Sequence, residues 1–255
     1  MVGDTMLVPI APAGKGAEPG SPIGDMLRRS ARPHRWIGLA LRVADLPAAD
    51  AWFRERGFTL HYDPGMEQIY FLIGRGQAMG MRLEVMAHDL PGDPRLDSRW
   101  SSAKWRDDHP LGIEGLQSIG LSTTSLDEAR ALFADRLDWP EIGVRALPHA
   151  QAQCAAFLIG DTVLEAMAAD DPAASVATHA RDTKGIQCLT FKVRSAQAAA
   201  DYLETRGFEL IGSPDTRFAI APDQAHGRLI WFTGQDVPGY PATVSQLRQP
   251  ARFST

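Results

Sequence analysis

The fold is decided by the stretch Trp52-Phe53-Arg54-Glu55-Arg56-Gly57-Phe58-Thr59-Leu60, because the chain repeats it as Tyr202-Leu203-Glu204-Thr205-Arg206-Gly207-Phe208-Glu209-Leu210. In both copies an amphipathic segment ends at a glycine and continues into a short apolar segment. This pattern is typical of a helix that ends at a glycine and is followed by a strand. The similarity therefore indicates two copies of one supersecondary unit.

A second similarity connects the first copy to the middle of the chain. The segment Phe71-Leu72-Ile73-Gly74 returns as Phe157-Leu158-Ile159-Gly160. Likewise, Arg82-Leu83-Glu84-Val85-Met86-Ala87 returns as Val163-Leu164-Glu165-Ala166-Met167-Ala168. Three copies of one unit account for both similarities.

Each copy has the same order of expected elements: a strand, a helix and three short strands. In unit one, an apolar strand over 36–43 leads to a helix with Asp45 as N-cap and Gly57 as its C-terminal glycine. Ser125, with Glu128 three residues later, opens the helix of unit two, and Ser195 opens that of unit three. The remaining strands are expected at 58–62, 68–73, 81–86, 116–123, 143–146, 152–159, 162–167, 186–193, 208–211, 217–220 and 228–232.

The expected fold class is α+β, with three βαβββ units that form curled mixed sheets and carry their helices on the outside. The segments at both ends, rich in Gly and Pro or in Pro, Gln and Ser, are expected to be irregular. The expected organisation is an arm (1–33), unit one (34–89), a linker (90–112), unit two (113–170), a second linker (171–184), unit three (185–236) and a tail (237–255).

A single βαβββ unit cannot bury both faces of its sheet, so it must pack against another unit. Three is an odd number, and one unit is left over. We expect either that the extra unit packs edge-on within the chain or that it pairs across a homodimer.

The composition limits the partners. The 255 residues hold 26 Lys and Arg against 31 Asp and Glu, a formal net charge of −5, and like charges are not clustered. Nucleic acids and anionic membranes need a basic face, so neither is expected as a partner. The two cysteines, Cys154 and Cys188, are too few for a disulfide framework. We therefore expect a soluble, cytoplasmic protein that acts on a small molecule or on another protein.

The repeated units, with Leu-Ala-Leu-Arg-Val-Ala-Asp-Leu at 39–46 entering the first helix, resemble the vicinal oxygen chelate (VOC) superfamily. That superfamily includes glyoxalases, bleomycin-resistance proteins, methylmalonyl-CoA epimerases and extradiol dioxygenases. The segments His109-Pro110-Leu111-Gly112 and Ala225-His226-Gly227 resemble those of glyoxalase-like proteins, in which His-Pro-Asn-Gly is the usual form. The likeness covers about residues 34–236.

The resemblance implies a cup that holds a divalent metal (iron, manganese or zinc) by a His or Gln on each first strand and a Glu on each last strand. The first-strand positions here are Gly38, Ser118 and Cys188, so no imidazole is present. The last-strand positions are Glu84, Glu165 and Trp231. Glu84 and Glu165 are candidates for metal ligand or catalytic base, and the alternative is that both face solvent.

Other histidines could complete a metal site, because two carboxylates alone are a poor set of ligands. His61, His149 and His226 are the candidates, and each could equally be an ordinary surface histidine. His109 lies beside Asp107 and Asp108. It is either a polarised catalytic base or a residue that caps the turn before Pro110.

Two functions remain open. The first is a glyoxalase- or dioxygenase-like enzyme, that is an isomerase, lyase or dioxygenase, acting on a small oxygenated or aromatic molecule in the cup. The second is a protein of the same fold that binds or sequesters a small molecule without chemistry.

Overall fold

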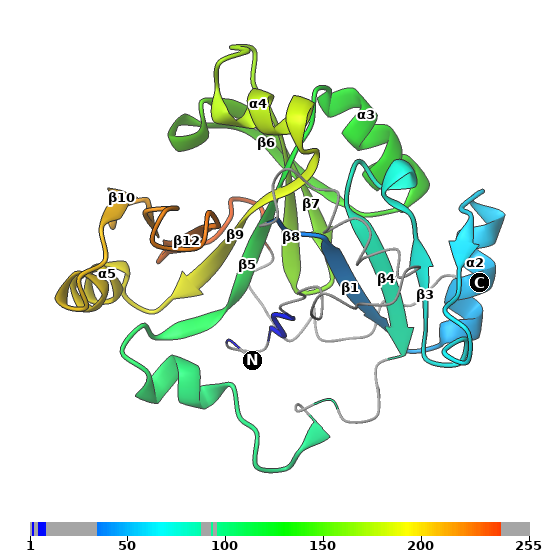
Figure 1. Cartoon of the computed structure of the whole chain (residues 1–255), viewed down its shortest axis with the longest axis horizontal. Helices are drawn as coiled ribbons and strands as arrows, with labels where there is room; N and C mark the ends of the chain where they lie inside the picture. The colour runs from blue at the N-terminus through cyan, green and yellow to red at the C-terminus, as the bar shows by residue number, and fades with distance from the viewer. Residues whose placement is uncertain (1, 3–4, 9–34, 88–92, 94–95, 241–255) are drawn as a thin grey trace, which may run out of the picture.

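The protein is described by a computed structural model that covers residues 2, 5–8, 35–87, 93 and 96–240. Its strands form two separate mixed sheets, a four-stranded sheet in the order β1-β4-β3-β2 and an eight-stranded sheet in the order β10-β11-β12-β9-β5-β8-β7-β6 (Figure 1). The predicted α+β class is confirmed. The strands are β1 (Gly38–Val43), β2 (Leu60–His61), β3 (Tyr70–Ile73), β4 (Arg82–Ala87), β5 (Ile113–Ser122), β6 (Glu141–Leu147), β7 (Ala152–Ile159), β8 (Thr162–Ala168), β9 (Gly185–Val193), β10 (Leu210–Ser213), β11 (Arg217–Ile220) and β12 (Leu229–Thr233).

The three helices that the sequence predicts begin at the expected residues. The side chains of Asp45, Ser125 and Ser195 each accept a hydrogen bond from the backbone N–H three residues later, which satisfies a free donor of the first turn. Gly57 follows the first helix with φ +74°, the left-handed conformation that a C-terminal glycine supplies. The helices are α2 (Leu46–Glu55), α3 (Leu126–Arg130), α4 (Ser175–Asp182) and α5 (Ala196–Thr205), with π-helical turns at Lys104–Asp108 and Ala131–Arg136.

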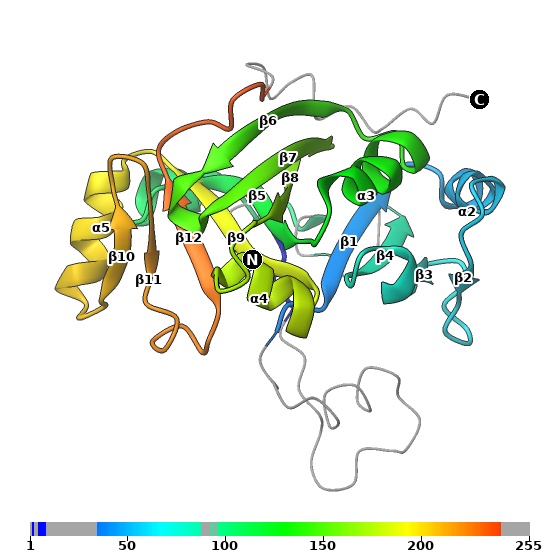
Figure 2. The same ribbon diagram turned by 90° about the horizontal axis from the view of Figure 1, so that it is seen from above.

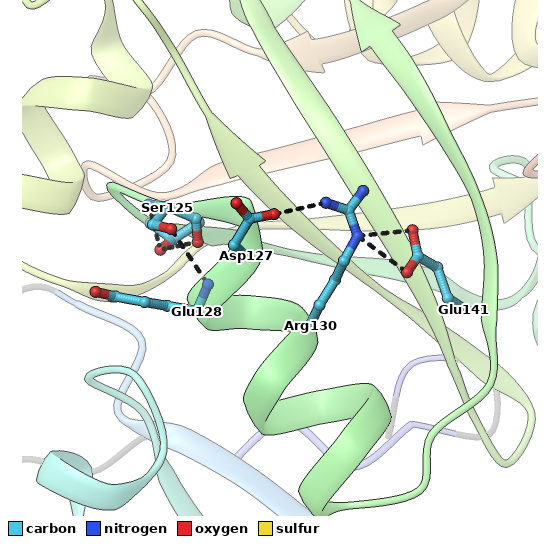
Figure 3. A network of polar contacts seen from close by, with 6 residues as sticks. Ser125, Asp127, Glu128, Arg130 and Glu141 are labelled. Atoms are coloured by element: carbon cyan, nitrogen blue, oxygen red, sulfur yellow. Dashed lines mark hydrogen bonds and ion pairs between the residues drawn. The ribbon is translucent and has the colours of Figure 1, made fainter.

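Helix α3 shows how its first turn is held on the surface (Figure 3). Ser125 caps the helix through the N–H of Glu128, at 3.2 Å. Arg130, one turn later, contacts Asp127 at 3.0 Å and Glu141 of strand β6 at 3.1 Å. The ion pair with Glu141 connects the helix to the edge of the eight-stranded sheet.

Units two and three are the ones that pair, and they do so edge to edge. Strand β5, the first of unit two, is antiparallel to β9, the first of unit three, with Ser118 opposite Thr190 and Gly120 opposite Cys188. Within each unit the first strand is parallel to the last strand, β5 to β8 and β9 to β12. The eight-stranded sheet is therefore two βαβββ sheets joined at their first strands.

Unit one has its own four-stranded sheet and attaches to unit two (Figure 2). Arg136, after helix α3, donates to the carbonyl oxygen of Arg56 at 2.7 Å and lies over the ring of Phe58 at 3.7 Å. A second contact joins Arg75, after β3, to the carbonyl oxygen of Thr183 at 3.2 Å. These contacts attach unit one to the rest of the chain.

The two faces of the eight-stranded sheet differ in what covers them. Helices α3 and α5 pack on one face, where Phe133, Phe157, Phe191 and Phe218 belong to the large core that unit one shares. The opposite face carries a smaller apolar cluster of Leu147, Ala152, Cys154, Ala156, Val163, Met167, Val176, Cys188, Ala219, Trp231 and Val237. We call this opposite face the cup.

Two features differ from the prediction. Strand β2 has only two residues where a strand over 58–62 is expected. The segment 171–184, expected to be a linker, contains helix α4, in which Val176 and Ala180 lie one turn apart and are buried. Two small apolar residues in a polar stretch give too weak a periodic signal for a helix prediction. Among the described residues, no helix has the length and apolar character needed to cross a membrane.

Candidate functional site

Glu165 lies at the centre of the cup. It is on β8 and is opposite Gly120 of β5 and Ala156 of β7, so its neighbours on the same face are small. A Cβ atom on Gly120 would lie 2.3 Å from Cys188 Sγ, so only glycine fits at this position. The small residues leave the space in which the Glu165 carboxylate lies, and its side chain is fully buried.

Three side chains bind the Glu165 carboxylate. Ser118 Oγ donates to Oε2 at 2.5 Å, Arg145 Nη2 donates to Oε1 at 2.5 Å, and Arg217 Nη1 donates to Oε2 at 3.3 Å. Burial alone would raise the pKa of Glu165, but the charge of Arg217, the Ser118 hydrogen bond and the charge of Arg145 outweigh it and lower the pKa. Glu165 is therefore an ionised carboxylate with its hydrogen-bonding capacity engaged.

The two arginines come from different units. Arg145 is on β6 of unit two and Arg217 is on β11 of unit three, and their side chains retain 18% and 13% of their exposure. The cluster holds two positive charges and one negative charge. Arg145 Nη1 is buried and has no hydrogen-bond partner among the described residues.

A further buried donor lies beside this cluster. Thr190 is opposite Ser118 on one side and Trp231 on the other, so it belongs to the cup. The residue is fully buried, and its Oγ1 has no hydrogen-bond partner in the described part of the chain. A buried hydroxyl without a partner is uncommon and points to a missing one.

His149 and Trp231 lie near the cluster and contact each other edge to face, with ring centroids 5.0 Å apart. The pKa of His149 is lowered to about 4, first by desolvation and then by the charges of Arg217 and Arg145, against the opposing effect of Glu165. The lowered pKa makes His149 neutral near pH 7, although the residue as a whole is exposed at the surface. A neutral imidazole can accept a proton.

The two cysteines are unpaired and buried, and burial raises the pKa of each to about 12. Cys188 packs in the apolar cluster of the cup together with Trp231. Both thiols are therefore protonated and poor nucleophiles.

The residues at Glu165 do not fit a divalent metal ion. Metal sites of this kind need three or more ligands, and no group of three His, Cys, Asp or Glu residues among those described could hold a metal. Moreover, two guanidinium groups contact the carboxylate, and their charge would repel a cation at the same oxygens. Ser118 stands at the first-strand position and donates a hydrogen bond to the carboxylate.

Glu84 and His61 lie in the other sheet, so the structure does not bring Glu84 together with Glu165. Leu72 stands between them in register, opposite Glu84 on one side and His61 on the other. Glu84 is half-buried, and burial raises its pKa above the ordinary value. His61 is exposed. The pair shares one sheet face but is separated by a strand.

His109 and His226 lie in loops away from the Glu165 cluster. His109 Nδ1 accepts the backbone N–H of Leu111 at 3.2 Å, and the ring packs on Trp105 with centroids 4.6 Å apart. Neighbouring Asp107 contacts Arg106 rather than His109. His226 adopts φ +51° in the turn between β11 and β12.

Arg145, Arg217 and Thr190 were not predicted from the sequence. In an alternating strand, an isolated arginine is normally assigned to the solvent side. Only the antiparallel joining of units two and three shows that both arginines face the cup.

A shallow hollow of about 270 Å³ lies at the β6–β7 hairpin beside Leu147 and Asp171, and Glu165 is not among its lining residues.

Residues 115–220 match the model of the Glyoxalase/Bleomycin resistance protein/Dioxygenase superfamily. The match begins in β5 and ends with β11, so it falls on the two units that build the cup. The resemblance to this superfamily that was drawn from the sequence is therefore confirmed over this segment of the chain. No curated protein matches the chain.

Solved structures of similar proteins align with about half of the chain. Methylmalonyl-CoA epimerase from Mycobacterium tuberculosis has 22% identity and a TM-score of 0.44, with 48% of this chain and 89% of that chain covered. A hypothetical protein from Bacillus halodurans C-125 has 20% identity and a TM-score of 0.43, covering 48% and 95%. A Streptomyces coelicolor methylmalonyl-CoA epimerase in complex with 2-nitronate-propionyl-CoA has 16% identity and a TM-score of 0.45, covering 49% and 98%.

Proposed function

We propose that the protein is an isomerase or lyase that acts on a small oxygenated molecule in the cup, without a metal ion at Glu165. The observation that carries the proposal is the pair of guanidinium groups, Arg145 and Arg217, on the buried carboxylate of Glu165. In metal-dependent members of the superfamily a cation at this position stabilises a developing negative charge. Here fixed positive charges in a site of low dielectric constant can stabilise an enolate-like oxygen.

His149 is the proposed proton acceptor. Its lowered pKa keeps the imidazole neutral at pH 7. The His149 ring contacts Trp231, and the positive charges of Arg217 and Arg145 act on it. Glu165 is not suited to this role, because its oxygens are engaged by three donors. A dioxygenase is less well supported, since it needs an iron ion and the donors at Glu165 do not fit one.

The second candidate is a binding protein that sequesters a small molecule. It is favoured by the apolar cluster around Trp231 and by the protonated thiols, which provide contacts but no nucleophile. Under this proposal the arginines recognise the ligand and His149 transfers no proton.

Proton exchange separates the two candidates. The purified chain would be incubated in D₂O with 2-oxo acids, hydroxyketones and phenols, and NMR would follow both binding and exchange of the proton next to the carbonyl. An isomerase or lyase must remove that proton, so we expect exchange. We also expect His149→Gln to slow the exchange by about 10²-fold or more, as for loss of a catalytic base.

His61→Gln is the matched control, because His61 is an exposed histidine on the other sheet, and its rate should equal that of the parent protein. Binding without exchange would support the sequestering protein instead. Neither binding nor exchange for any compound would contradict both candidates.

Metal removal tests the rest of the proposal. Dialysis against a chelator should leave exchange and ligand binding unchanged, because Arg145 and Arg217 occupy the Glu165 carboxylate. Metal content measured before dialysis should be well below one ion per chain. A stoichiometric metal whose removal abolishes exchange would contradict the proposal.

We further propose a homodimer through β1. The first strands of units two and three pair with each other, whereas β1, the first strand of unit one, is at the edge of its sheet in the described part of the structure. Two copies could pair their β1 strands in the same antiparallel manner. Light scattering on the eluting protein should give the mass of two chains, and a monomer at all concentrations would contradict this.

The cytoplasm remains our proposed location. The two buried cysteines are unpaired, which fits a reducing compartment. Fractionation of cells that express the full chain tests it.

A further inference from the structure

We propose that the cup binds the carboxylate group of a small organic anion through Arg145 and Arg217, with Thr190 as an additional donor. The inference rests on the proposed function, because it names the class of molecule that the same cup takes. It goes further in that it requires the ligand to carry a full negative charge before any reaction.

The Glu165 cluster carries a net positive charge. Arg145 and Arg217 bring two positive charges to one carboxylate, and Glu165 neutralises one of them. A buried charge without a partner is unfavourable. A ligand carboxylate would neutralise the remaining charge. The side chains of Arg145 and Arg217 retain some exposure, so solvent reaches part of each arginine.

Two hydrogen-bond donors at the cup are unused by the described residues. Arg145 Nη1 is buried and makes no hydrogen bond with a described residue, and the same holds for Thr190 Oγ1. The two donors belong to the same face, because Thr190 is opposite Ser118, and Ser118 shares the Glu165 carboxylate with Arg145. Arginine presents its donors as a planar fork that suits a carboxylate.

Apolar side chains lie next to these donors. Trp231 is opposite Thr190 on β12, is buried in the cluster of the cup, and is in contact with His149. An aromatic or alkyl group attached to the carboxylate would lie on this surface. The arrangement therefore fits a small aromatic or aliphatic carboxylate rather than a bare inorganic anion.

The test compares benzoate with benzamide, which has the same ring but no charge, by calorimetric titration of the full chain at low ionic strength. We expect saturable binding of benzoate, about tenfold tighter than that of benzamide, because a charge-assisted hydrogen bond is stronger than a neutral one. Inorganic phosphate is a third probe and should bind more weakly than benzoate, because it makes no contact with Trp231.

Two variants locate the binding. Thr190→Val keeps the size of the side chain and removes the hydroxyl, and it should weaken benzoate about threefold or more. Thr233→Val is the matched control. Thr233, on β12, is buried like Thr190, but its hydroxyl already donates to the carbonyl oxygen of Thr216. Its substitution should therefore leave the benzoate affinity unchanged. Arg145→Lys keeps the charge beside Glu165 and loses the fork, and it should weaken benzoate about tenfold.

The outcomes separate this inference from the proposed function. Equal binding of benzoate and benzamide would overturn the carboxylate site and leave a small-molecule cup in place. Benzoate binding that Thr190→Val and Arg145→Lys both leave unchanged would also overturn it, since the anion would then bind elsewhere. No saturable binding of benzoate at millimolar concentration overturns it too. If the proton-exchange panel then yields no ligand either, the proposed function fails as well.

Discussion

Arg145 and Arg217 lie in different βαβββ units, near opposite ends of the eight-stranded sheet, yet both guanidinium groups contact the carboxylate of Glu165. This is possible because the sheet is curled, so that side chains on its inner face converge. The cluster therefore has two consequences: it holds units two and three together across the cup, and it places positive charge at the Glu165 carboxylate.

The first consequence predicts a large effect on stability. Glu165→Gln removes the only negative charge between the two described guanidinium groups of the cluster and leaves them buried without a counter-ion. Loss of one partner from a buried ion pair costs about 3–5 kcal/mol. Urea unfolding at pH 7 should show a free energy of unfolding lower by about that amount.

Glu141→Gln serves as the control for that measurement. Glu141 contacts Arg130 on the surface, as Figure 3 shows, and both side chains remain partly exposed. Exposed pairs contribute about 1 kcal/mol or less. Equal effects of the two substitutions would mean that the Glu165 cluster stabilises the cup no more than a surface pair does.

Glu84 should behave in the opposite way. Burial raises its pKa above the ordinary 4.5, so the folded state disfavours the carboxylate. The contribution of the protonated Glu84 to the free energy of unfolding is fully present below pH 4.5. It is lost as the pH rises through the raised pKa of this residue. Glu84→Gln should therefore increase the urea midpoint at pH 7 and leave it unchanged below pH 4.5. A lower midpoint at pH 7 would show that Glu84 is held by a cation.

The helix ends were predictable because their signals are local. The caps Asp45 and Ser195 bond to an N–H three residues away, and the left-handed Gly57 directly follows its helix. The internal repeat then extended these local signals to the whole order of elements. Helix α4 lacked such a signal, since it begins after Ala174 without a side-chain cap.

The site was only half predictable. The position of Glu165 follows from the repeat and from the resemblance, but its partners are 20, 47 and 52 residues away along the chain. Whether Arg145 faces the cup depends on the register of β6 against β7, where an irregularity shifts the pairing between Glu141 and Gly143. Such a shift exchanges the two faces of a strand. A sequence pattern alone could not assign this arginine.

A third prediction concerns the acid side of the stability curve. The pKa of His149 is lowered from 6.5 to about 4, so the unfolded chain takes up a proton in this interval and the folded chain does not. Stability should therefore fall as the pH decreases from about 6.5 to about 4. In His149→Gln this part of the pH dependence should be shallower, as measured by thermal unfolding. An unchanged slope would mean that the imidazole is not desolvated.

The last prediction concerns the contact between unit one and the first residue of β9. Gly80 and Gly185 meet with φ +87° and φ +89°, and a Cβ atom on Gly185 would lie 2.7 Å from the carbonyl oxygen of Gly80. Because that neighbour is backbone, it cannot rotate away. Gly185→Ala combines this clash with the roughly 1 kcal/mol that a left-handed alanine costs.

Gly207 isolates the clash, because its φ of +82° is nearly the same and a Cβ atom there meets nothing within 4 Å. Gly207→Ala should therefore show the conformational cost alone, and Gly185→Ala should lower the free energy of unfolding by about 1–3 kcal/mol more. Chemical denaturation of both variants measures the difference. Equal losses of free energy of unfolding would mean that unit one does not press against Gly185. The contacts of Arg75 and Arg136 would then suffice to hold unit one in place.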